Sequence, residues 1–116
     1  MKPIRNLKLE EIQLISFLLK DKPEYFAFLQ ELPDLFVSEM DDGGMGSLEF
    51  VAAAAKSKIM RDEIARIDLN DNDGLPLSIA VNTNVFDEVY ELDVFKADFS
   101  PLKRFPVAPY VFNYYS

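Results

Sequence analysis

The sequence predicts an α+β domain in which two N-terminal helices pack on an antiparallel β-meander of about five strands. Apolar side chains recur at helical spacing up to Pro33. Beyond residue 62, apolar and polar side chains alternate, which is typical of strands with one buried face. Between these parts lies the stretch 41–47, whose three glycines suit the loop of a hairpin.

The spacing predicts a first helix over residues 8–20, capped by Asn6. A second helix is predicted over residues 23–32, with Asp21 as its cap. It should end at Pro33, because the residue before a proline is pushed away from helical geometry.

The second predicted helix carries an aromatic cluster that includes Tyr25, Phe26 and Phe28. Aromatic residues at this spacing most often fill a core. A ligand pocket is the alternative that the same spacing allows.

Five strands are expected, over residues 35–40, 48–52, 63–69, 77–82 and 89–96. In the last one, Tyr90, Leu92 and Val94 share one face, opposite Glu91, Asp93 and Phe95. The alternation does not decide which face of residues 35–40 is buried. Residues 52–62 suit a helix by propensity, but we expect a loop or short helical turn over 54–61.

The stretch from Asn70 to Gly74 predicts a tight turn, because Gly74 supplies a positive φ. It is not a calcium loop: with Gly74 at the sixth position, Leu69 and Ala80 would occupy the first and twelfth, where carboxylates are required. The glycines of 41–47 are likewise no phosphate cradle, because no lysine follows them and two aspartates precede them.

The bulk composition excludes several classes of protein. The chain has 116 residues, enough for one domain with its own core, and contains neither cysteine nor histidine. A disulfide, a thiolate nucleophile and a Cys/His zinc site are therefore impossible. The N-terminus lacks the features of a signal peptide, and no apolar run is long enough to span a membrane. We expect a cytoplasmic protein without a cofactor.

The net charge of −8 is unevenly distributed. No Lys or Arg occurs between Lys22 and Lys56 or between Arg66 and Lys96, yet these two gaps hold 14 of the 20 acids. Such a field repels phosphate backbones, so a nucleic-acid partner is not expected. The acids are either a solvated surface that keeps the protein soluble or a face that docks a basic partner.

Glu49, Glu91 and Asp93 are predicted to share an exposed face of the sheet. Carboxylates on facing strands can act as an acid/base pair or hold a divalent cation. The alternative is cross-strand pairing with Arg66 and Lys96 on a solvated face.

Two segments carry a resemblance to a known family. They are EMDDGGMGSL at residues 39–48 and YELDVFKADFSPL at residues 90–102. Over about residues 7–102 the chain resembles a family of small bacterial proteins of unknown function. The resemblance implies a stand-alone bacterial domain. Since both segments belong to one pattern, it also suggests that Asp41 or Asp42 lies near Lys96 or Asp98.

We therefore expect a non-enzymatic protein-binding module, similar to an immunity or antitoxin-type inhibitor of a basic partner. Its candidate binding residues are Asp41, Asp42, Glu49, Glu91, Asp93, Lys96 and Asp98. One alternative is a carboxylate-dependent hydrolase or a divalent-metal-binding protein that uses Glu49, Glu91 and Asp93. Another is a structural subunit that oligomerises through a sheet edge or through the aromatic tail at 105–116, which is expected to pack on its own domain or on a neighbour.

Overall fold

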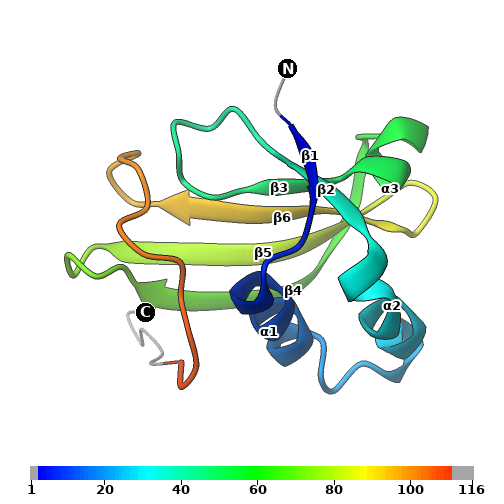
Figure 1. Ribbon diagram of the computed structural model, residues 1–116, viewed down its shortest axis with the longest axis horizontal. Coiled ribbons are helices and arrows are strands. Elements are labelled where there is room, and N and C mark those ends of the chain that lie inside the picture. The colour runs from blue at the N-terminus through cyan, green and yellow to red at the C-terminus, as the bar shows by residue number, and fades with distance from the viewer. Residues whose placement is uncertain (1–2, 111–116) are drawn as a thin grey trace.

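Six strands form one antiparallel sheet in the computed structural model, which describes residues 3–110 (Figure 1). The α+β class with an antiparallel sheet agrees with the prediction. In chain order the elements are β1 (Ile4–Asn6), α1 (Leu9–Leu18), η1 (Pro23–Tyr25), α2 (Phe26–Glu31), η2 (Leu32–Asp34), β2 (Phe36–Glu39), β3 (Leu48–Phe50), α3 (Val51–Lys56), β4 (Met60–Asn70), β5 (Pro76–Asn84) and β6 (Val89–Lys96).

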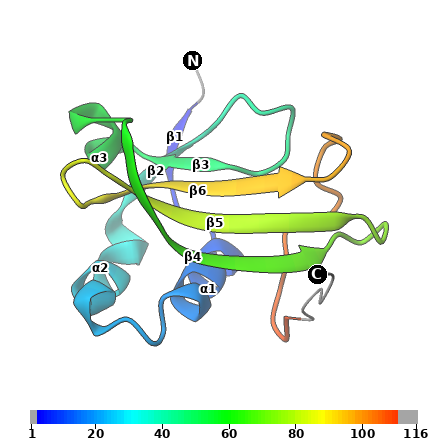
Figure 2. The ribbon, with the colours of Figure 1, turned by 180° about the vertical axis from the view of Figure 1, so that it is seen from behind.

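The strands are not arranged as a simple meander, so that part of the prediction is wrong. Their spatial order is β1-β2-β3-β6-β5-β4. β1, β2 and β3 are consecutive neighbours, and so are β4, β5 and β6, but β3 pairs with β6 instead of β4 (Figure 2). Local alternation identifies a strand but carries no information about its neighbours, which explains the error.

The N-terminal region differs from the prediction in its caps and in one added strand. Asn6 belongs to β1 and donates its side-chain amide to the Leu35 carbonyl at 3.0 Å, while Lys8 occupies the cap position of α1. Asp21 is not the cap of the second helix either, since Lys22 holds that position without a side-chain bond. Pro33 does not end the helical path, because it fits the first turn of η2.

One face of the sheet, here called the core face, packs against the helices (Figure 1). Val37 of β2 is fully buried on it, which settles the open parity of that strand. Leu92 and Val94 of β6 are also buried there, as the alternation predicts. The opposite side, here called the outer face, carries Glu91 and Asp93.

The short helix α3 occupies residues predicted as the end of a strand and the start of a loop. Its alanines favour a helix, and Ala53 and Ala54 are buried. The helix carries the chain from β3 towards the far edge of the sheet, where β4 begins.

Lys96 ends β6 on the core face, and its side chain is completely buried. Its Nζ donates to Asp71 Oδ2 at 2.7 Å, to Asp73 Oδ2 at 2.6 Å and to the Pro101 carbonyl at 3.3 Å. The expected position of Lys96 on a solvated face is therefore wrong. The ammonium instead joins three segments: the end of β6, the β4–β5 turn and the chain that follows β6.

Asp71 also holds the segment that follows β6. Its carboxylate accepts the backbone N–H groups of Lys103 at 2.7 Å and Arg104 at 3.2 Å. Burial alone raises the pKa of Asp71, but the bonds from Lys96 and these N–H groups outweigh it and hold the pKa below its usual value. The carboxylate is thus charged in the folded protein.

The glycine loop, residues 41–47, lies against the segment after β6. The Gly44 carbonyl accepts the Leu102 N–H at 2.9 Å, and Asp42 accepts the N–H groups of Met45 and Ser47. Gly46 adopts φ +102°, and a Cβ placed there would lie 3.2 Å from Leu102 Cδ2. The two segments that carry the family resemblance are therefore neighbours.

Replacing Asp71 should destabilise the fold strongly. Asp71→Asn removes a charge that Lys96 faces in a buried site, and we expect a loss of about 3 kcal/mol in the free energy of unfolding, measured by denaturant titration. Since the pKa of Asp71 lies below its unfolded value of about 3.9, its contribution is present above that pH and is lost as the pH falls further.

Asp98→Asn is the control, because Asp98 is exposed and accepts its hydrogen bonds from nearby Ser100. These bonds and the charge of Lys96 hold the pKa of Asp98 below its usual value, so the variant should lose some stability, but much less than Asp71→Asn. Equal losses in the two variants would show that the ion pairs of Lys96 with Asp71 and Asp73 stabilise the fold no more than an exposed carboxylate does.

Gly46→Ala should cost more stability than Gly74→Ala. Both positions have positive φ, but nothing lies within 4 Å of a Cβ at Gly74. Gly74→Ala should therefore cost only the backbone strain of about 1–2 kcal/mol, while Gly46→Ala also displaces Leu102. Denaturant unfolding measures both, and a smaller loss at Gly46 would contradict this view of the loop.

Candidate functional site

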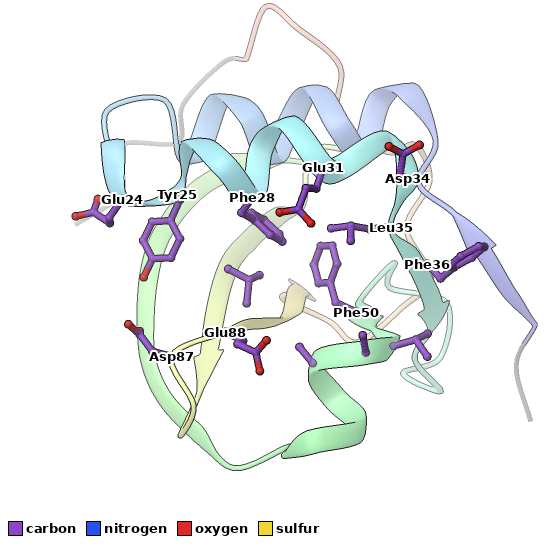
Figure 3. A pocket seen from close by; sticks show the side chains of 14 residues that line it. Glu24, Tyr25, Phe28, Glu31, Asp34, Leu35, Phe36, Phe50, Asp87 and Glu88 are labelled. Carbon is purple, nitrogen blue, oxygen red and sulfur yellow. The ribbon is translucent and has the colours of Figure 1, made fainter.

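A pocket of about 580 Å³ opens between the α2 region and α3. Its walls come from residues 24–36, from the end of β3 with the start of α3, and from residues 87–89 (Figure 3). This volume lies within the range of sites that take a drug-sized ligand or an anchoring side chain. The pocket lies at the end of the sheet where the β5–β6 hairpin turns.

The inner wall of the pocket is apolar and aromatic. Phe28 of α2 and Phe50 of β3 pack edge to face, with ring centroids 5.4 Å apart, and Figure 3 shows them at the centre of the pocket. Tyr25 adds a third ring beside Asp87. Aromatic residues of the second predicted helix therefore serve both the core and a pocket.

The charged residues of the lining are all carboxylates. They are Glu24, Glu31, Asp34, Asp87 and Glu88. Within residues 3–110, the ion pairs formed by these five acids comprise one contact, between Glu88 and Lys56 Nζ at 3.1 Å. The other four side chains are exposed and leave their charge available to a ligand.

The electrostatics of Tyr25 reflect this surrounding. Burial raises the pKa of its phenol, and the negative charges of Asp87 and Glu24 raise that pKa further. Tyr25 therefore stays neutral, and it offers an aromatic face next to carboxylates. The aromatic ring and the neighbouring carboxylates both attract a cation to this part of the pocket.

The sequence contained a signal for this pocket that the prediction did not use. The two stretches without Lys or Arg are residues 23–55 and 67–95. Every residue that lines the pocket belongs to one of them. Folding brings these two stretches together, and both contribute residues to the same cavity.

The predicted binding residues lie elsewhere. Asp42 holds the glycine loop, Asp41 is exposed on it, and Asp98 bonds to Ser100. Lys96 is buried with Asp71 and Asp73 rather than with Asp41 or Asp42. The predicted residues thus divide between the glycine loop, the buried site of Lys96, the segment after β6 and the outer face.

Glu49, Glu91 and Asp93 do lie together on the outer face. Glu49 of β3 stands directly opposite Glu91 of β6, and Asp93 follows two residues later on the same face. Glu49 is paired with Lys58 Nζ at 3.0 Å. Neither the pocket beside α2 nor a second one near the chain segment 104–110 is lined by these three acids.

Two acids of the outer face hold protons more tightly than usual. Burial raises the pKa of Glu91; a hydrogen bond from Asn82 at 2.7 Å opposes this, and the charges of Asp93 and Glu49 add to it. Burial likewise raises the pKa of Asp93. A hydrogen bond from the Ser47 hydroxyl lowers this pKa, and the negative charge of Asp42 raises it further. Among residues 3–110, no group of three or more acidic side chains is arranged to hold a metal ion.

The free edge of the sheet at β4 is poorly suited to pairing with another strand. This strand of 11 residues carries two irregularities in its register with β5, between Met60 and Asp62 and between Glu63 and Ala65. It also carries five charged residues. Charges and bulges are the devices by which sheet edges avoid strand addition.

The fold and the pocket define a small α+β domain with an acidic, aromatic cavity. The chain belongs to the family described as the domain of unknown function DUF6984, whose model matches residues 4–106. Neither a curated protein nor a solved structure matches the chain. In the described part of the chain, no helix has the length and apolar character needed to cross a membrane.

Replacing Glu91 by Gln should stabilise the protein at neutral pH. Since the folded pKa of Glu91 lies above its unfolded value of about 4.3, the charged carboxylate costs stability as the pH rises through the folded pKa. Glu91→Gln keeps an acceptor for Asn82 and removes the charge. We expect a higher melting temperature than wild type at pH 7.

The difference should shrink as the pH falls and vanish well below the unfolded pKa of about 4.3, where Glu91 is protonated in both states. A thermal unfolding series across this pH range tests it. An advantage that persists in acid would assign the effect to packing instead of charge.

Proposed function

We propose that this domain is a non-enzymatic binding module that docks a basic protein partner in the pocket between α2 and α3, in the manner of an immunity or antitoxin-type inhibitor. The observation that carries the proposal is the lining of the pocket: an aromatic wall, five carboxylates and no Lys or Arg. A site of this composition suits a ligand that is apolar along its length and cationic at its end.

Lysine and arginine side chains have this character. Their methylene stems pack on apolar surface while the charged end stays near water. The rings of Phe28, Phe50 and Tyr25 offer the apolar surface, and the exposed acids at the rim meet the charge. The aromatic faces add a cation–π attraction.

The net charge supports the same class of partner. A protein with a formal charge of −8 attracts cationic proteins over long range and repels phosphate backbones. Association with a basic partner should be fast at low ionic strength and should weaken as salt screens the charges.

The proposal is tested with a synthetic peptide in which lysine alternates with serine, measured by fluorescence anisotropy at low salt. The pocket variant combines Glu31→Gln with Asp34→Asn. Since both acids are exposed at the rim, the fold should be unaffected. We expect the variant to bind the peptide about tenfold more weakly than the wild type.

The matched control combines Glu91→Gln with Asp93→Asn, which removes the same charge from the outer face. It should bind the peptide nearly as well as the wild type. Equal weakening in both variants would mean that only the net charge acts. A larger loss in the control would place the site on the outer face and overturn the proposal for the pocket.

A further inference from the structure

Four large apolar side chains are exposed beside the pocket, at the turn between β5 and β6. Ile59, Met60, Val85 and Phe86, here called the apolar tip, have exposed fractions of 67%, 49%, 46% and 60%. The Val85 N–H donates to the Ile59 carbonyl at 3.0 Å, and Met60 pairs with Asn84. The four residues therefore come from two segments joined side by side.

A buried amide holds the apolar tip in place. The side chain of Asn84 is fully buried, and its oxygen accepts the N–H groups of Phe86 at 3.0 Å and Glu88 at 3.2 Å. Its nitrogen donates to the carbonyls of Ala53 and Ser57, at 3.1 and 3.0 Å. The turn is thus fastened to α3, and its apolar side chains are displayed on a fixed backbone.

The apolar tip adjoins the pocket along the chain. Asp87 and Glu88 follow Phe86 directly and form one wall of the cavity. Asp87 adopts φ +60°, within the tight turn closed by its own N–H bond to the Asn84 carbonyl at 2.9 Å. The chain therefore passes from exposed apolar surface to pocket carboxylates within two residues.

We propose that the partner presents a basic amphipathic segment, whose cation enters the pocket while a neighbouring apolar side chain packs on the apolar tip. This inference rests on the proposed function and specifies the partner. Clustered apolar side chains on a soluble domain mark interaction sites, and a fixed backbone lowers the entropy lost when they bind.

The charge around the apolar tip selects this occupant over two others. Lys58 and Arg61 flank Ile59 and Met60 in the chain, but Lys58 is paired with Glu49 at 3.0 Å and Arg61 with Asp62 at 3.6 Å. Within residues 3–110, the charges beside the apolar tip that form no ion pair are those of Asp87 and the other exposed acids of the pocket. A second copy of the chain would bring the same acids against them, and an anionic lipid surface would be repelled. A segment with lysine or arginine beside an apolar residue complements both features.

The test compares two peptides of equal length and charge, one with lysine alternating with leucine and one with lysine alternating with serine. The wild type should bind the leucine peptide at least about tenfold more tightly, the gain expected from burying one large apolar side chain. Phe86→Ser should abolish this preference and leave the affinity for the serine peptide unchanged. Ile59→Ser should reduce the preference in the same direction.

The matched control is Phe99→Ser. Phe99 is 68% exposed, but it follows the opposite end of β6 and packs edge to face against Phe95, with ring centroids 5.1 Å apart. It should keep the preference for the leucine peptide. Thermal unfolding of each variant confirms that the fold is retained.

The outcomes separate the two proposals. If the serine peptide binds through the pocket but the leucine peptide binds no more tightly, or if Phe86→Ser and Phe99→Ser act alike, this inference is overturned and the proposed function stands. If neither peptide binds the wild type, the proposed function fails, and the inference fails with it.

Discussion

The buried ammonium of Lys96 is the interaction on which the rest of the structure depends. It faces two carboxylates, Asp71 and Asp73, so the charges are met by ion pairs and hydrogen bonds rather than by water. The β4–β5 turn, the end of β6 and the chain that follows β6 meet at this point, and the glycine loop packs on the last of them through Leu102. A turn, a strand end and a loop without regular structure thereby acquire fixed positions at one end of the sheet.

The opposite end of the sheet is organised by a neutral group. Asn84 satisfies two N–H groups of the β5–β6 turn and two carbonyls at the end of α3. The pocket lies between α3, this turn and the α2 region, so these four bonds hold two of its walls together. The end of β6 and the β5–β6 turn lie at opposite ends of the sheet (Figure 1). One end is therefore held by the ion pairs of Lys96, and the other, beside the candidate site, by the amide of Asn84.

The sequence predicts what depends on local alternation and composition. The faces of β6 and the turn at Gly74 are as expected, because the pattern of each is complete within a few residues. The strand order is not predictable in this way, since β6 must find β3 across more than 40 residues. Lys96 and Asn84 look like surface residues, and only the partners supplied by the fold explain their burial. The sequence contains two signs of the candidate site: the aromatic residues of the second predicted helix, and the two stretches that lack Lys and Arg.

The central place of β6 has a consequence for synthesis on the ribosome. Among the strands of residues 3–110, the last to emerge is the one that joins β1–β2–β3 to β5–β4. Until residues 89–96 leave the exit tunnel, the nascent chain consists of two half-sheets, each with an unpaired inner edge. Long-range pairing of this kind closes slowly and leaves strand edges open to other chains in the meantime. The edges of β3 and β5 therefore stay open to other chains until β6 is available to pair with both.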